Sequence, residues 1–167
     1  MSSIRIIPEK ELKLISDSWA LFGGEIYWKT GRSRGKIACS TSRKSGHENV
    51  YLTVDGKLRG YVKSRIIWFL RTGEYPYLLV EHKDCNPKNN SVENLRLATQ
   101  SQNMANIQVG RTGKHKKGVY LDKRVGKYYA QVQKDGRVFS KTGFATFDEA
   151  YAVRQQMADK LFGEFAR

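Results

Sequence analysis

Residues 107–116 constrain the fold most strongly, because they offer almost nothing that a folded domain can bury. With the two residues that follow, this segment holds three glycines and five basic side chains, counting His115. Such a composition favours an exposed connection between folded parts. We therefore expect two domains, residues 1–106 and 117–167, joined by a basic linker. The linker is either a passive tether or a further contact with a polyanionic partner.

The composition supports two modest hydrophobic cores and a partner of negative charge. Hydrophobic residues make up 40% of the 167 positions and aromatic residues 11%, too much for a chain that is disordered throughout. Lys and Arg number 30 against 16 acidic residues, so the formal net charge is +14. Nucleic acid is the first candidate for the partner, and the alternative is a charge that only keeps the protein in solution.

Several other classes of protein are disfavoured. No segment has the apolar length of a membrane-spanning helix, and no basic amphipathic helix indicates a membrane surface. The first residues lack the charged start and apolar run of a secretory signal, so we expect an intracellular protein. Cys39 and Cys85 have no second thiol or histidine nearby at zinc-finger spacing, which disfavours a structural zinc and a disulfide framework.

The N-terminal region is expected to be a β-rich scaffold. Residues 1–60 favour short strands and turns, and Asp55-Gly56 is a strong hairpin signal. The apolar spacing in residues 63–73 then predicts a short buried helix, with Gly73 as its left-handed cap.

Residues 77–106 carry the groups that point to chemistry. An apolar strand ends in Glu81 and His82, a loop rich in Asn and Lys follows, and a second short strand leads to a helix. Thr99 and Gln102 have the spacing of a capping box at the start of that helix. A strand, strand, helix unit can bring a carboxylate, an imidazole and amide oxygens together, as hydrolysis of a phosphodiester requires.

This stretch resembles the H-N-H endonucleases, specifically the phage and intron-encoded homing branch. That family has an acidic residue before a histidine, an Asn twelve positions later and another Asn or His twenty-one positions later. Glu81, His82, Asn94 and Asn103 occupy those positions, and the likeness runs over about residues 65–106. Taken singly, the histidine suits a surface, the first Asn a turn and the second Asn a helix, so their joint spacing carries the prediction.

The resemblance implies a role for each of the four residues. His82 is the general base that deprotonates the attacking water, and Asn94 orients its ring through the second nitrogen. Glu81 and Asn103 hold one divalent ion, Mg²⁺ or Mn²⁺, which stabilises charge on the phosphate and on the leaving 3′ oxygen. No small-molecule cofactor is implied.

Two features of this stretch leave alternatives open. The family usually has Asp where this chain has Glu81, and the added methylene predicts slower cleavage or a preference for Mn²⁺. The three basic side chains of the stretch, Lys83, Lys88 and Arg96, are either phosphate contacts or solvated charges.

The C-terminal part predicts three short strands followed by one amphipathic helix, with a capping box at Thr146 and Glu149. Segments 117–120, 126–132 and 143–150 resemble the Apetala-type DNA-binding domain. Strand alternation places Ala130 and Val132 against the helix. On the third strand it places Arg137, Phe139 and Lys141 on the outward face. The expected contacts with double-stranded DNA are Lys117, Lys127, Tyr129, Gln131, Gln133, Arg137, Phe139 and Lys141, and the alternative is a solvated polar face.

The predicted fold class is therefore α+β. A β-rich region leads into a ββα-metal (His-Me finger) nuclease unit at about residues 76–106, and a three-stranded antiparallel sheet packed on one helix follows. The predicted function is a metal-dependent DNA endonuclease that nicks or breaks both strands at a recognised site. We expect a monomer or weak dimer, in the cytoplasm of the host bacterium if a phage encodes it.

Two alternatives remain from the sequence. The first is a sequence-specific DNA-binding protein whose H-N-H site is impaired by Glu81. The second is an RNA-binding protein, but the sequence lacks the stacking motifs expected for binding single strands.

Overall fold

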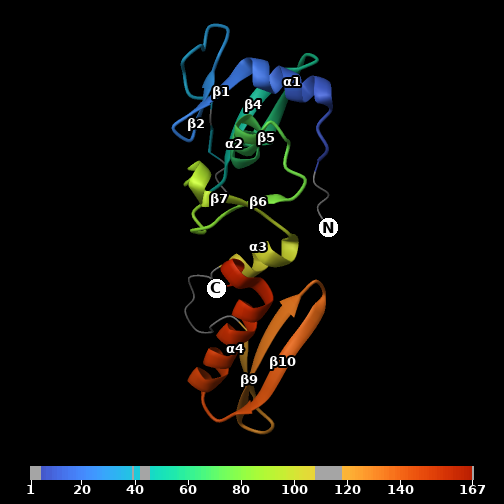
Figure 1. Cartoon of the computed structure of the whole chain (residues 1–167), viewed down its shortest axis with the longest axis vertical. Helices are drawn as coiled ribbons and strands as arrows, with labels where there is room; N and C mark the ends of the chain where they lie inside the picture. The colour runs from blue at the N-terminus through green and yellow to red at the C-terminus, as the bar shows by residue number, and fades with distance from the viewer. Residues whose placement is uncertain (1–4, 39, 42–45, 108–117, 167) are drawn as a thin grey trace. The chain divides into compact units, whose positions relative to one another are not determined.

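The computed structural model in Figure 1 describes residues 5–38, 40–41, 46–107 and 118–166. The chain forms two compact units, Met1–Leu97 and Ala98–Arg167. The unit boundary thus precedes the helix that begins at Gln100, whereas the sequence places a domain boundary after that helix. Apart from Ile107, the predicted linker lies outside the described residues. The functional division into a nuclease domain and a DNA-binding domain stays a prediction.

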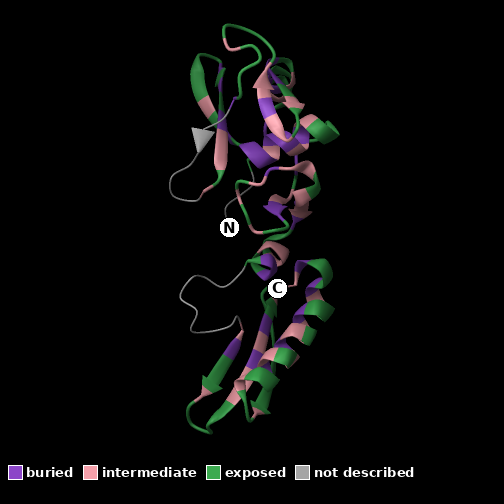
Figure 2. Cartoon of the chain, turned by 90° about the vertical axis from the view of Figure 1, so that its left-hand side faces the viewer, coloured by how far each residue is buried: buried purple, intermediate pink, exposed green. Residues whose placement is uncertain are grey.

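The first unit mixes helices with small sheets. Its elements in chain order are α1 (Glu9–Ser18), β1 (Trp19–Phe22), β2 (Glu25–Trp28), β3 (Ser40–Thr41), β4 (Glu48–Val54), β5 (Lys57–Val62), α2 (Lys63–Thr72), β6 (Leu79–His82), η1 (Val92–Asn94) and β7 (Leu95–Ala98). β1 pairs with β2, β4 lies between β3 and β5, and β6 pairs with β7. Buried residues of α1, α2, β1, β2, β4, β5 and β7 share one hydrophobic core, and Figure 2 colours the buried residues of the chain purple. The most completely buried members of this core are Ile15, Trp19, Ile26, Val50, Ile66 and Ile67.

The β4–β5 hairpin and α2 follow local signals in the sequence. Asp55 and Gly56 both have positive φ, 49° and 74°, as a two-residue hairpin turn of this twist requires. α2 ends at Gly73, which adopts the left-handed conformation with φ 78°. Both predictions are confirmed, and the helix buries the expected apolar face through Ile66, Ile67 and Phe69.

The helix α1 corrects the expectation of only strands and turns before residue 60. It buries Ile15 completely and also buries a charged residue, Glu11, which a hydrophobic pattern does not predict. The Glu11 carboxylate accepts hydrogen bonds from Arg59 at 3.0 Å and from the Tyr61 hydroxyl at 2.6 Å. Burial and this hydrogen bond raise the pKa of Tyr61. These contacts tie α1 to the β4–β5 hairpin.

The second unit contains α3 (Gln100–Asn106), β8 (Val119–Asp122), β9 (Lys127–Lys134), β10 (Arg137–Phe144), α4 (Phe147–Phe162) and η2 (Gly163–Phe165). The strands form an antiparallel sheet in the order β10, β9, β8. Capping boxes at Thr99 and Thr146 begin α3 and α4, as predicted. The mixture of helices and small antiparallel sheets in both units agrees with the α+β class, while the ββα-metal unit stays a prediction.

Faces of the C-terminal sheet follow from burial and register. Ala130 and Val132 of β9 are buried, and α4 packs on β9, as predicted. On β10, Lys141 pairs with Ala130 and Phe139 pairs with Val132. Residues directly opposite each other in an antiparallel pair point to the same face. The prediction that Arg137, Phe139 and Lys141 face away from the helix is therefore wrong, and their contact with DNA stays a prediction.

The error has a simple geometric cause. The turn at Asp135-Gly136 has two residues, so Lys134 pairs with Arg137. Odd-numbered residues of β10 then face the same way as even-numbered residues of β9, and the alternation cannot be carried unchanged across the turn. Residues of β10 stay exposed up to Gly143, because the strand lies at the edge of the sheet (Figure 2). The outward face comprises Tyr120, Asp122, Lys127, Tyr129, Gln131, Gln133, Val138, Ser140 and Thr142.

Among the described ranges of both units, no helix has the length and apolarity that crossing a membrane demands.

Gly118 should be essential to the second unit, and Gly126 should not. Both have positive φ, 73° and 66°. A Cβ at Gly118 would lie 2.3 Å from the backbone oxygen of Gln131, whereas a Cβ at Gly126 would meet nothing within 4 Å. Gly118→Ala should lower the free energy of unfolding by about 1–3 kcal/mol more than Gly126→Ala. Chemical denaturation, with amide exchange at Gln131 as a local readout, checks this, and equal losses would contradict it.

Candidate active site

Glu81 and His82 are the last two residues of β6, and the segment before this strand is anchored to α2. Both side chains are buried, with 4% and 6% of their surface exposed. Arg65 of α2 donates hydrogen bonds to the carbonyl oxygens of Pro76 at 2.5 Å and Leu78 at 2.8 Å. Since α2 is fixed in the core, these contacts position the chain just before the strand that ends in His82.

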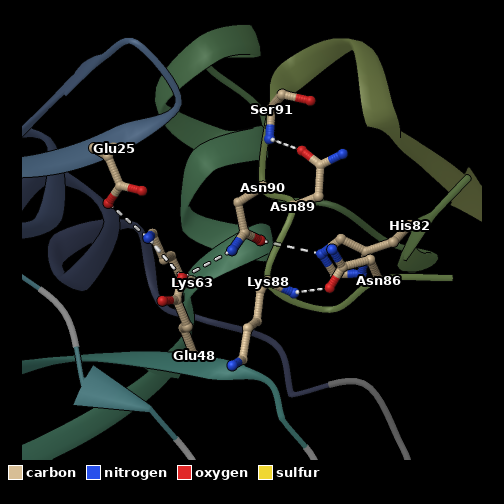
Figure 3. Close-up of polar contacts among 9 residues, drawn as sticks. All are labelled: Glu25, Glu48, Lys63, His82, Asn86, Lys88, Asn89, Asn90 and Ser91. Atoms are coloured by element: carbon tan, nitrogen blue, oxygen red, sulfur yellow. Dashed lines mark hydrogen bonds and ion pairs between the residues drawn. The ribbon is translucent and has the colours of Figure 1, made fainter. Parts of the chain in front are cut away.

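The loop after His82 is ordered by its own Asn and Asp side chains. Asp84 accepts a hydrogen bond from the backbone N–H of Asn86 at 2.8 Å, and Asn86 accepts one from the N–H of Lys88 at 3.1 Å. Asn89 accepts a third from the N–H of Ser91 at 3.3 Å, and Figure 3 shows the last two of these contacts. Side chains of this type mimic backbone turns. The Asn-rich composition therefore folds the loop.

Asn94 joins the two ends of this loop. Its Oδ1 accepts from the backbone N–H of Asp84 at 3.1 Å, and its Nδ2 donates to Asp84 Oδ1 at 2.9 Å and to the carbonyl of Asn89 at 2.7 Å. Burial acts to raise the pKa of Asp84, but the hydrogen bonds from Asn86, Asn89 and Asn94 and the nearby His82 ring leave it below its usual value. These contacts occupy both ends of the Asn94 amide.

The amide that faces the His82 ring belongs to Asn90, four positions before the residue expected from the sequence. Asn90 Oδ1 lies 3.1 Å from His82 Nε2, and both residues are buried. The other end of the same amide, Nδ2, donates to Glu48 Oε2 at 2.9 Å. Figure 3 shows Asn90 between the two side chains.

Behind Asn90 lies a buried ion-pair cluster that the sequence did not indicate. Lys63, only 1% exposed, donates to Glu48 Oε2 at 2.6 Å and to Glu25 Oε2 at 2.7 Å. Hydrogen bonds thus run from Glu25 of β2 through α2 and β4 to the His82 ring (Figure 3). A lysine at the start of a helix with a buried apolar face was the available signal, but its partners lie too far away in sequence to be found from spacing.

His47 is a second residue that sequence spacing missed. Its ring lies just before β4, 5.7 Å between centroids from the His82 ring and tilted by 43°. Desolvation and repulsion from His82 lower the pKa of His47. A pair of imidazoles therefore borders the site.

Glu81 is held by a cation from the neighbouring strand. Its Oε1 lies 2.5 Å from Arg96 Nε of β7, and both side chains are largely buried. Arg96 was predicted to contact phosphate. In the structure its guanidinium instead neutralises the carboxylate that was predicted to bind metal.

Comparison of the sequence with known proteins identifies the family of this chain. Residues 61–105 match the family model described as HNH endonuclease. An uncharacterized HNH endonuclease of Acanthamoeba polyphaga mimivirus is 30% identical over 151 residues, which cover 90% of this chain and 70% of that protein. The chain belongs to the HNH endonucleases. No solved structure matches it.

HNH endonucleases generally depend on a divalent metal, and the donor chemistry at Glu81 fits one. Carboxylate and amide oxygens are the ligands that hard divalent ions prefer. Within the described ranges, no group of three His, Cys, Asp or Glu side chains converges as a preformed metal site. An ion at Glu81 would therefore rely on amide, water or substrate oxygens and would share the carboxylate with Arg96.

The remaining predicted residues are placed as follows. Asn103 lies on α3 of the second unit, and its part in metal binding stays a prediction. Lys83 Nζ donates to the carbonyl of Glu93 at 2.8 Å, and Lys88 is exposed on the loop. Lys117 lies outside the described residues.

The sheet of this HNH protein presents a polar, aromatic outer face. Lys127, Tyr129, Gln131 and Gln133 lie on it, as the burial of Ala130 and Val132 requires. Tyr120, which was not predicted to take part, stacks on Tyr129 with 5.3 Å between ring centroids and 29° between ring planes. Register across β8 and β9 identifies this pair, whereas alternation within one strand does not.

Asn94→Ala should loosen the loop of the HNH site mainly at Asp84, where the Asn94 side chain joins the two ends of the loop. The loss of its three side-chain contacts should speed exchange of the Asp84 amide by about tenfold, the equivalent of about 1.4 kcal/mol. Exchange of the Lys88 amide, which bonds to Asn86, serves as the control and should change less. Equal protection at Asp84 in the variant and the parent would contradict the role given to Asn94.

Proposed function

We propose that this HNH protein is a metal-dependent DNA endonuclease of the homing type, which hydrolyses phosphodiester bonds at a recognised site. The observation that carries the proposal is His82, buried at the end of β6 with one ring nitrogen held 3.1 Å from an amide oxygen. An imidazole fixed at one nitrogen presents the other to a water molecule near neutral pH. One such site in a monomer suits a nick, whereas a break in both strands needs two sites acting together.

Each site residue has a distinct part in the proposed reaction. His82 accepts the proton of the attacking water, and Asn90 orients its ring. Asn94 acts on His82 only indirectly, because it holds the loop that carries Asn90. Glu81 and Asn103 would hold one Mg²⁺ or Mn²⁺ ion, which would polarise the phosphate and stabilise charge on the leaving oxygen.

Binding to double-stranded DNA is supported by charge and by the outer face of the sheet. The net charge of +14 favours contact with phosphates, to which Lys83, Lys88 and the 107–116 linker would add. On the outer face, Gln131 and Gln133 are able to pair with adenine edges in the major groove. The resemblance to Apetala-type domains supports the same use of the sheet.

A second candidate function is favoured by the contact between Glu81 and Arg96. Glu81 Oε1 lies 2.5 Å from Arg96 Nε, so a metal must share the carboxylate with the guanidinium or displace it. The longer Glu side chain stands where the family usually has Asp. A sequence-specific DNA-binding protein with an impaired HNH site would result if metal cannot enter.

Cleavage of supercoiled plasmid and phage DNA in Mg²⁺ or Mn²⁺ tests these two functions. The wild-type protein should produce nicked or linear products, EDTA should stop the reaction, and His82→Ala should slow it by about 100-fold or more. Salt-sensitive binding without cleavage, together with activity gained in Glu81→Asp, would establish the second candidate. Cleavage that His82→Ala leaves unchanged would exclude His82 as the base.

The face of the sheet that contacts DNA can be tested with surface variants of the full chain. The double variant Lys127→Ala, Gln131→Ala removes two outer-face groups and should weaken binding to the preferred site by about tenfold or more. Lys141→Ala removes a charge on the opposite face and should weaken it by about threefold or less. Binding isotherms on a site mapped from cleavage ends decide this. A larger loss of affinity from Lys141→Ala than from the double variant would show that DNA contacts the face of the sheet on which α4 packs.

A further inference from the structure

The ion-pair cluster beneath Asn90 is unusual in burying a lysine almost completely. Its ammonium has carboxylate partners on two different strands, Glu48 on β4 and Glu25 on β2. Burying such a charge is costly unless it is paired, so the cluster rigidly couples α2 to both strands. The family match spans residues 61–105 and therefore excludes both glutamates. Glu48 is linked to the His82 ring through Asn90, so the cluster can act on the candidate site as well as on the fold.

The cluster determines which way the Asn90 amide points. Glu48 Oε2 holds the Lys63 ammonium at 2.6 Å, and an ionised carboxylate can only accept hydrogen bonds. The Asn90 atom that lies 2.9 Å from Glu48 must therefore be the Nδ2 donor. Its Oδ1 acceptor is then left to face His82 Nε2.

The orientation of the amide in turn determines the tautomer of His82. An amide oxygen accepts and cannot donate, so Nε2 must carry the hydrogen. In a neutral imidazole the lone pair then lies on Nδ1. We infer that Lys63 and Glu48 are positioning residues that act through Asn90 to hold His82 in the Nε2–H tautomer, which makes Nδ1 the atom that accepts a proton. The catalytic consequence rests on the proposed function, but the tautomer does not.

Lys63 matters because it keeps Glu48 an acceptor. A neutral side chain at position 48, such as glutamine, is able to donate to Asn90 Oδ1 and so allows the amide to flip. The flipped amide would present its NH₂ group to Nε2, and the imidazole hydrogen would then move to Nδ1. Nδ1 would then carry the hydrogen and would have no lone pair to accept a proton.

The experiment compares full-length variants by ¹⁵N NMR of the imidazole and by cleavage kinetics. Long-range ¹H–¹⁵N spectra of the metal-free protein, recorded with the imidazole ring neutral, identify the protonated nitrogen of His82 directly. Spectra of His82→Ala assign its signals. Glu48→Gln removes the charge, Glu48→Asp keeps an acceptor, and Glu11→Gln neutralises another buried, ion-paired glutamate in the same unit as a control.

The wild-type protein, Glu48→Asp and Glu11→Gln should show hydrogen on Nε2. Glu48→Gln should shift the population toward Nδ1–H and lower kcat by about 10- to 100-fold, with KM changed by about twofold or less.

Hydrogen on Nδ1 in the wild-type protein would overturn the inference without any variant. A Glu48→Gln variant in which both the His82 tautomer and kcat are unchanged would also overturn the inference. A wild-type protein that shows the Nε2–H tautomer but cleaves no DNA would instead reject the proposed function and leave the positioning role intact.

Discussion

The buried ammonium of Lys63 is the constraint on which the first unit depends. A charge that is 1% exposed must be paired, and its partners at 2.6 and 2.7 Å come from strands of two different sheets. Removing either glutamate would take one of the two carboxylates away from this buried charge, so the relative positions of α2, β2 and β4 are tightly specified. The loop after His82 is attached to this frame through the hydrogen bond from Asn90 to Glu48. Fold and candidate active site therefore share one interaction.

The loop that carries Asn90 has little apolar material of its own. Its order comes from hydrogen bonds of Asp84, Asn86, Asn89 and Asn94 to nearby backbone groups. Each is worth about 0.5–1.5 kcal/mol net, so the loop depends on several acting together. A polar loop of this kind keeps the Asn90 amide 3.1 Å from the His82 ring. Hydrophobic packing alone would not give such directional control.

Local chemistry was predictable from the sequence, and long-range pairing was not. The Asp55-Gly56 turn, the cap at Gly73 and both capping boxes depend on neighbours a few positions apart. The carboxylate partners of Lys63 and Asn90 lie 15 to 42 positions away, which no spacing rule reaches. The family spacing named His82 as the base, which stays a prediction, and Asn94 as the amide at its ring, where the structure has Asn90. Strand alternation likewise succeeded within β9 and failed on β10, because a two-residue turn exchanges the faces.

The carboxylate of Glu81 has its counter-charge within the fold itself. A buried anion without a counter-charge would cost several kcal/mol, and Arg96 supplies that charge from the adjacent strand. A divalent ion offers two positive charges to the same carboxylate, so exchange or sharing is electrostatically favourable where oxygen ligands complete its shell. The Arg96 guanidinium would also suit a phosphate, which it would recognise through the same N–H groups. Arg96 thus stabilises the metal-free fold, and the prediction that it contacts phosphate is compatible with the ion pair.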